Sequence, residues 1–223
     1  MRSAASSRLR QAESQLASAG VETPRLDAEL LLASAMDASR SEVVAGLAPD
    51  PSPEQLTRFE AAVERRAARE PLAYIVGSQG FRRIELDVDG RVLIPRPETE
   101  LLVAVVKVGR PCGILDVATG SGAVALALAD ELPDATIVAS DVSAEALAVA
   151  RANAGRLGFE IDFVESDLLA SVDGVFDAIA ANLPYVARGE LAGLQPEITD
   201  YEPALALDGG EDGLDLVRAL APQ

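Results

Sequence analysis

The polar residues that could do chemistry stand where apolar runs end. Residues 113–122 read GILDVATGSG, an apolar run that ends in a glycine turn, and an alanine-rich stretch follows at 123–129. A helix that begins at such a turn offers unpaired N–H groups, and glycines let a ligand press against the backbone. Asp141 ends the next apolar run, where a carboxylate can accept both hydroxyls of a ribose. The pattern predicts a cradle for a nucleotide-like cofactor, with an ordinary turn and an incidental aspartate as the alternative.

A second group of such residues, Asn182-Leu183-Pro184-Tyr185, follows a later apolar run. Ligands of open α/β sheets gather at the carboxyl ends of the strands, so this tetrapeptide is expected at the same edge as the glycine turn. The glycines and Asp141 alone also fit a nicotinamide dehydrogenase. An asparagine followed by X-Pro-aromatic has no obvious use in hydride transfer and matches enzymes that methylate amino groups. Taken alone, the tetrapeptide also fits a strand-ending turn with a packed tyrosine.

The elements that must position these residues alternate along the second half of the chain. Strands are expected at residues 113–118, 136–141, 160–164 and 175–181, and helices at 121–130, 144–157 and 214–220. Strands that alternate with helices pair in parallel and are connected by right-handed crossovers. The sequence therefore predicts an α/β fold with a doubly wound, mainly parallel sheet.

The first half of the chain reads as helices followed by a hairpin. Helices are expected at about 5–19, 24–36, 41–46 and 53–68. Thr23 is expected to cap the second helix and Ser52 the fourth, the latter in a capping box with Gln55. The apolar face of the second helix is expected to contain Leu26, Leu30, Leu31 and Met36.

A linker joins the two halves. Residues 84–88 and 91–94 alternate around Asp89-Gly90, which predicts a β-hairpin, and a new helix is expected to begin at Pro97. We therefore expect three parts. Residues 1–75 form a helical bundle, residues 76–100 a bridging hairpin, and residues 101–223 the α/β domain.

Composition excludes several kinds of chemistry. The chain has no histidine, which removes Ser-His and Cys-His pairs, histidine bases and most zinc sites, and no metal site is expected. Its only cysteine, Cys112, is expected to be a buried thiol. A net charge of −17 favours a basic protein surface over direct nucleic-acid binding. No apolar stretch resembles a membrane span or secretory signal, so a cytoplasmic location is expected.

Three further segments narrow the interpretation. They are residues 70–77 (EPLAYIVG) with Phe81, residues 93–100 (LIPRPETE) and residues 202–215 (EPALALDGGEDGLD). Together with the tetrapeptide they resemble the release factor N5-glutamine methyltransferase family over most of the chain. The resemblance implies a Rossmann-like class I methyltransferase domain that uses S-adenosyl-L-methionine and releases S-adenosyl-L-homocysteine. The implied substrate is the glutamine of the Gly-Gly-Gln loop in class 1 peptide chain release factors, docked by the helical bundle.

The resemblance also implies roles for individual residues. The implied cofactor-binding residues are Ala118, Thr119, Gly120, Ser121, Gly122, Asp141 at the ribose, Asp167 and Leu168 beside the adenine, and Asn182. The implied catalytic residues are Asn182, Leu183, Pro184 and Tyr185. Asp116 fits either attraction of the cofactor's ammonium or capping of the loop. Phe81 and Arg96 fit either the pocket or ordinary packing.

Three departures from the family pattern leave alternatives open. Ala118 replaces the usual first glycine of the turn, and Leu183 gives a tetrapeptide better known from adenine dimethylases of ribosomal RNA. The chain also ends at Gln223, where the family continues through further strands, so reduced stability, association or lost activity is expected. An adenine N6-methyltransferase acting on RNA or DNA and a non-catalytic binding module are the alternatives.

Overall fold

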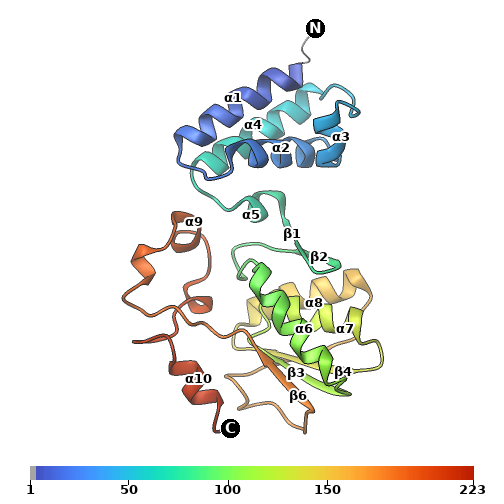
Figure 1. Cartoon of the computed structure of the whole chain (residues 1–223), viewed down its shortest axis with the longest axis vertical. Helices are drawn as coiled ribbons and strands as arrows, with labels where there is room; N and C mark the ends of the chain where they lie inside the picture. The colour runs from blue at the N-terminus through green and yellow to red at the C-terminus, as the bar shows by residue number, and fades with distance from the viewer. Residues whose placement is uncertain (1–3) are drawn as a thin grey trace. The chain divides into compact units, whose positions relative to one another are not determined.

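The structure, a computed structural model, describes residues 4–223, which form two compact units. The helical unit contains the chain through Val76 together with Pro196–Tyr201. The α/β unit contains Gly77–Gln195 and Glu202–Gln223. Figure 1 shows the elements of both units in chain order.

The helical unit is built around three packed helices. Its elements are α1 (Ala4–Ser18), α2 (Pro24–Ala35), α3 (Arg40–Ala45), α4 (Pro53–Ala67), α5 (Leu72–Val76) and α9 (Pro196–Thr199). Leu16, Leu31, Leu32 and Phe59 are almost fully buried where α1, α2 and α4 meet. The predicted capping box of Ser52 is confirmed at the start of α4. The four N-terminal helices were predicted, whereas α5 and α9 were not.

Two predictions for α2 are wrong. Thr23 stands before the helix, but its hydroxyl donates to Asp27 Oδ1 at 2.7 Å and does not cap the backbone. Leu26 is exposed, and Leu32 lies in the core. The reason is that Asp27 and Glu29 are buried on this helix and paired with arginines, which hydrophobic periodicity cannot reveal.

An ion-pair network joins α9 to the N-terminal helices within the helical unit. Glu197 of α9 accepts a hydrogen bond from Arg66 Nη1 at 2.9 Å and from Arg69 Nη2 at 2.6 Å. Arg66 also donates from Nε to Asp27 Oδ2 at 2.8 Å. Burial raises the pKa of Glu197, but the hydrogen bonds from Arg69 and Arg66 outweigh it and bring this pKa to about 2. Glu197 is therefore held as a carboxylate.

The α/β unit contains a hairpin, a sheet and flanking helices. Its strands are β1 (Ser78–Phe81), β2 (Ile84–Asp87), β3 (Gly113–Val117), β4 (Thr136–Asp141), β5 (Asp162–Glu165) and β6 (Ala178–Ala181). Its helices are η1 (Pro97–Thr99), α6 (Glu100–Val108), α7 (Ala123–Glu131), α8 (Ala144–Leu157), η2 (Leu191–Gly193), η3 (Ala204–Ala206) and α10 (Asp215–Leu220). Across residues 4–223, the structure contains no helix with the length and apolar character needed to cross a bilayer.

The sheet confirms the predicted fold class. Its strand order is β5-β4-β3-β6, and all three pairings are parallel. Helix α7 packs on β3 and β4, and α8 packs on β4 and β5. Leu216 and Leu220 of α10 pack against Leu115 and Val117 of β3. Because β4 lies on one side of β3 and β6 on the other, the chain order reverses at β3.

The linker hairpin differs from the prediction. Strand β2 is present, but it pairs antiparallel with β1 through a turn at Arg82-Arg83, and residues 91–94 form no strand. The Asp89-Gly90 pair does make a turn, in which Asp89 Oδ1 accepts from Arg91 N at 3.0 Å. The apolar residues after it, Val92 among them, are buried as irregular chain. Their alternation therefore reflected burial and not strand pairing.

The prediction that Cys112 is buried is also wrong. Cys112 is exposed because it lies one residue before β3, outside the sheet. Its backbone N–H donates to Asp177 Oδ2 at 2.9 Å, which fixes the chain where the strand begins.

Candidate active site

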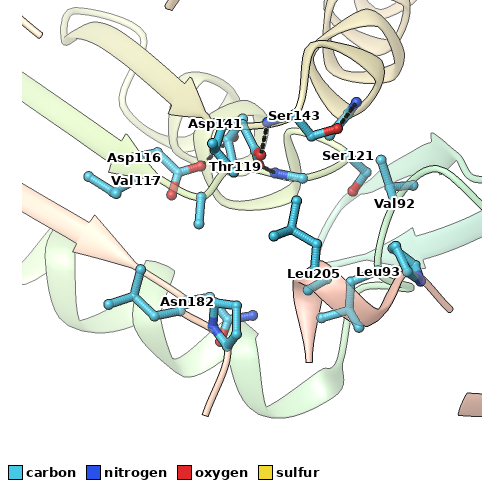
Figure 2. A pocket seen from close by; sticks show the side chains of 18 of the residues that line it. Val92, Leu93, Asp116, Val117, Thr119, Ser121, Asp141, Ser143, Asn182 and Leu205 are labelled. Carbon is cyan, nitrogen blue, oxygen red and sulfur yellow. Dashed lines mark hydrogen bonds between the residues drawn. The ribbon is translucent and has the colours of Figure 1, made fainter. Parts of the chain in front are cut away.

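A cavity of about 370 Å³ lies within the α/β unit where β3, β4 and β6 end. Because the chain order reverses at β3, this is the crevice in which open α/β sheets bind ligands. Its size falls in the range of small-molecule sites, roughly 300–1,000 Å³. In Figure 2, Asn182 and Leu205 lie across the cavity from Thr119 and Asp141.

The glycine turn after β3 forms one wall. Thr119 N donates to Ser140 O of β4 at 3.0 Å, and Gly122 N donates to Thr119 O at 2.9 Å, so backbone hydrogen bonds tie the turn to β4 and close it. Gly122 adopts φ +85°, and a Cβ there would stand 2.9 Å from Leu126 Cδ1. Gly122 is the N-cap residue of α7 and, unlike the four residues before it, does not line the cavity. Its missing side chain leaves room for Leu126 of α7 and Ala150 of α8.

Ala118 occupies the strained position of this turn. Its φ is +57°, in the left-handed region where a Cβ costs about 1–2 kcal/mol. Ala118 also lines the cavity. The replacement of the usual glycine by Ala118 therefore strains the backbone at the wall of the cavity.

Asn153 is a positioning residue that the sequence interpretation missed. It is fully buried on α8, and its Nδ2 donates to Ser121 O and to Asp87 O, both at 3.0 Å. Its Oδ1 accepts from Asp87 N at 2.8 Å. The Asn153 side chain of α8 thus joins the glycine turn to β2. An asparagine inside a helix, where it is a poor helix former, was the available signal.

Asp141 is fixed by two backbone donors at the end of β4. Its Oδ2 accepts from Gly120 N and its Oδ1 from Ser143 N, both at 2.9 Å. A carboxylate has four acceptor sites, so each oxygen keeps capacity for a further hydrogen bond. Asp141 lines the cavity, and this geometry suits a pair of vicinal hydroxyls.

Asp116 is a buried carboxyl at the same wall. Its Oδ2 accepts from Thr119 Oγ1 at 2.6 Å and from Ala125 N at 3.1 Å, so it caps the loop. Within residues 4–223, its Oδ1 has no hydrogen-bond partner. Burial raises the pKa of Asp116 to about 7, against these hydrogen bonds and with a smaller contribution from the charge of Asp141. An ionised Asp116 would gain from a cation in the cavity.

The predicted cofactor residues Asp167 and Leu168 follow β5 and also line the cavity. Leu168 has φ +50°, again in the left-handed region. Asp167 is exposed, whereas Leu168 is half-buried and packs against the Leu115 and Val117 face of the sheet.

The tetrapeptide after β6 is only partly in the cavity. Asn182, Leu183 and Pro184 line it, whereas Tyr185 does not and is 68% exposed. Leu183 is buried against the sheet. The Asn182 carboxamide has no hydrogen-bond partner in the part of the chain that the structure describes. Its oxygen and nitrogen are therefore available to a ligand.

The opposite wall comes from two segments far apart in sequence. It includes Leu93 and Pro95 of the linker, Pro203 just before η3 and Leu205 within η3. The sequence interpretation assigned no role to these residues, although both segments belong to the motifs that carried the resemblance. Their apolar side chains suit the uncharged parts of a ligand.

Arg96 and Phe81 do not line the cavity. Arg96 instead donates from Nη2 to Glu202 Oε1 at 2.6 Å, and Phe81 is buried in the core. The Glu202 side chain is nearly inaccessible, and burial raises its pKa despite the nearby guanidinium. The ion pair ties together the two segments of the apolar wall.

The site has no histidine and offers no metal-binding cluster. Among the residues described, no three His, Cys, Asp or Glu side chains gather as metal ligands. What it offers is a turn of backbone donors, two carboxyls, an unpaired carboxamide and an apolar wall. Such a set can hold a nucleoside-like, positively charged ligand beside a planar polar group.

Comparisons with known proteins find matches to two domain families and to full-length relatives. Residues 8–77 match the PrmC N-terminal domain, and residues 97–199 match the methyltransferase small domain. The release factor glutamine methyltransferase of Moorella thermoacetica is 44% identical over 221 residues, which is 96% of this chain and 78% of that protein. That of Geobacter sulfurreducens is 41% identical over 210 residues, 93% of this chain and 74% of its own. The solved ribosomal protein L11 methylase of Lactobacillus delbrueckii subsp. bulgaricus is 31% identical with a TM-score of 0.39, covering 53% of this chain and 61% of that one.

Proposed function

The chain belongs to the release factor glutamine methyltransferase family, and from this premise we propose that it methylates a glutamine side chain. The acceptor is the amide nitrogen, N5, of the glutamine in the Gly-Gly-Gln loop of class 1 peptide chain release factors. The observation that supports this most directly is the Asn182 carboxamide, which lines the same cavity as Asp141 and the glycine turn and has no partner among the described residues.

The proposed methyl donor is S-adenosyl-L-methionine. When bound, it supplies a methyl group on a sulfonium sulfur, and transfer of that methyl leaves S-adenosyl-L-homocysteine. Asp141 would accept hydrogen bonds from the ribose hydroxyls, Asp167 and Leu168 would hold the adenine, and the turn from Ala118 through Gly122 would hold the amino-acid part. The carboxylate form of Asp116 would attract the ammonium group.

The tetrapeptide orients the substrate amide. An amide nitrogen is a poor nucleophile because its lone pair is delocalised into the carbonyl, so orientation and electrostatic help must lower the barrier. The Asn182 side-chain oxygen and the Leu183 carbonyl accept the two N–H bonds of the glutamine amide. Positive charge develops on the nitrogen as it takes the methyl group, and these two hydrogen bonds strengthen.

Pro184 and Tyr185 complete this arrangement in the proposal. Pro184 restricts Leu183 to an extended conformation, which presents its carbonyl. Tyr185 is exposed beside the cavity, where its ring can cover the flat amide of an incoming loop. After transfer the positively charged nitrogen releases one proton to water, and no base is required before attack.

The helical bundle and the location follow the same proposal. Residues 1–75 dock the release factor, residues 76–100 bridge, and residues 101–223 carry out methyl transfer. The net charge of −17 favours a basic protein surface as partner, with no direct nucleic-acid or membrane contact. The proposed compartment is the cytoplasm, where release factors work.

The test is methyl transfer to a purified release factor. The protein is mixed with labelled S-adenosyl-L-methionine and a class 1 release factor, and the mass of the Gly-Gly-Gln peptide is measured. A release factor with alanine in place of that glutamine is the control. We expect one methyl group on the glutamine and none on the control. Label on adenine of added RNA, with none on the glutamine, would contradict the proposal and favour the adenine N6-methyltransferase.

A further inference from the structure

A glycine-rich segment, residues 208–213, packs directly against the chain that follows β6. Val186 N donates to Leu207 O at 3.0 Å, and Gly209 N donates back to Val186 O at 2.9 Å. Arg188 N donates to Gly210 O at 2.8 Å, and Val186 and Asp208 form an isolated parallel bridge. The tetrapeptide is thus followed at once by a strand-like contact with this segment.

The glycines of this segment are required by space. A Cβ on Gly209 would stand 2.7 Å from Tyr185 Cα and 2.8 Å from Pro184 O. A Cβ on Gly213 would stand 2.3 Å from Tyr185 O. These neighbours are backbone atoms, so any side chain would displace the tetrapeptide itself. Gly209 does not have a left-handed φ, so at this position the close approach alone requires glycine.

The segment is also held by hydrogen bonds of its own. Asp208 Oδ1 accepts from Gly210 N at 2.9 Å, and its Oδ2 accepts from Arg188 Nε at 3.1 Å. Asp215 N donates to Gly209 O at 3.1 Å. Upstream, Glu202 is paired with Arg96. A stretch fixed at both ends therefore supports the tetrapeptide from the side of Pro184 and Tyr185.

We propose that Gly209 and Gly213 are positioning residues for methyl transfer. They let residues 208–213 act as a backbone brace that sets where the Asn182 carboxamide and the Leu183 carbonyl stand. The inference rests on the proposed function, since it explains how the two acceptors keep the spacing that a glutamine amide needs. A displacement of about 1 Å in such a site can cost on the order of 100-fold in rate.

The experiment compares Gly209→Ala with Gly189→Ala. A Cβ on Gly189 would meet nothing within 4 Å, and its φ is outside the left-handed region, so it controls for the added methyl group. Three quantities are measured: kcat on a release factor, the cofactor Kd by calorimetry, and hydrogen exchange of the Val186 amide. For Gly209→Ala we expect kcat to fall about 10- to 100-fold, Kd to stay within about twofold, and Val186 exchange to accelerate about tenfold. Gly189→Ala should match the wild type in all three.

Other outcomes decide against the brace. A Gly209→Ala protein with wild-type kcat would overturn the inference, because the substitution would then have no effect on methyl transfer. A Gly209→Ala protein whose cofactor Kd rises as much as kcat falls would also overturn it, because the substitution would then disturb the whole site. If Gly209→Ala does not fold, Asp208→Ala replaces it, since this removes only the acceptor for Gly210 N and Arg188. We expect about a threefold loss of kcat with unchanged Kd, and an unchanged kcat overturns the inference. If the wild type methylates no release factor, the proposed function fails. The rate of hydrogen exchange at the Val186 amide then still tests whether residues 208–213 hold the chain that follows β6.

Discussion

Lowering the pH from 7 to 5 protonates Asp116, whose pKa burial raises to about 7. In the proposed complex, the carboxylate form attracts the cofactor's ammonium and the protonated form does not. The apparent Kd is the intrinsic value divided by the ionised fraction, so it should rise about fivefold between pH 7 and 6 and about ninefold between pH 6 and 5. The chain has no histidine, the side chain whose ordinary pKa lies in this range.

Calorimetric titration of S-adenosyl-L-methionine across this pH range tests the reasoning. Asp116→Asn should bind more weakly and lose the pH dependence. Asp141→Asn is the matched control, because it removes a ribose contact and should weaken binding while keeping the slope. In Asp141→Asn the rise in Kd should begin at a lower pH, since the charge of Asp141 contributes to the raised pKa of Asp116.

Two results would refute this account of Asp116. One is a wild-type Kd that stays constant between pH 5 and 7, and the other is a slope that survives in Asp116→Asn. The stability of the free protein provides a second check, because it should change with pH in the opposite direction to the affinity for the cofactor. Its free energy of unfolding should fall as the pH rises from about 4 to about 7, because the folded state keeps a proton that the unfolded chain has lost.

Two further predictions concern stability. Ala118→Gly removes a Cβ at φ +57° and should raise the free energy of unfolding in urea by up to about 1 kcal/mol, and an unchanged midpoint would contradict the strain. Glu197→Gln leaves two arginines without their carboxylate and should cost about 2–4 kcal/mol at pH 7. The pKa of Glu197 is about 2, below its usual value, so its contribution is present above about pH 4.5 and is lost as the pH falls towards 2. The difference in Tm between Glu197→Gln and the wild type should therefore shrink in acid, and a constant difference would argue against the ion pairs.

The sheet could be predicted because its signals are local. Strand β4 and helix α8 have the expected bounds, since an apolar run, an aspartate and a serine cap follow one another in the sequence. The glycine turn, Asp141 and the tetrapeptide were expected at one edge because carboxyl ends of parallel strands meet there. Their positions around one cavity follow from topology alone.

The hairpin could not be predicted because its turn depends on distant residues. Arg82 adopts φ +51° in a turn without glycine. Its N–H donates to Glu100 Oε1 at 2.9 Å, and its guanidinium pairs with Glu131 on α7. These contacts come from residues 18 and 49 positions away, so the Asp89-Gly90 pair was the stronger local signal and gave the wrong partner.

The apolar wall of the site was missed for a related reason. Leu93 and Leu205 have no chemistry that distinguishes them from core residues, and only the fold brings their segments together. The exposed Tyr185 shows the opposite case, in which a predicted catalytic residue lies outside the cavity. Its proposed contact with the substrate stays a prediction.

Methyl transfer by Asn182→Ala tests the central claim most directly. Wild type and variant are compared at saturating labelled S-adenosyl-L-methionine, with the same release factor and with mass measurement of the Gly-Gly-Gln peptide. We predict that the variant transfers methyl groups about 100-fold more slowly or worse, the usual cost of removing one oriented hydrogen-bonding group from a transition state. Transfer at the wild-type rate would contradict the claim that the Asn182 carboxamide holds the substrate amide.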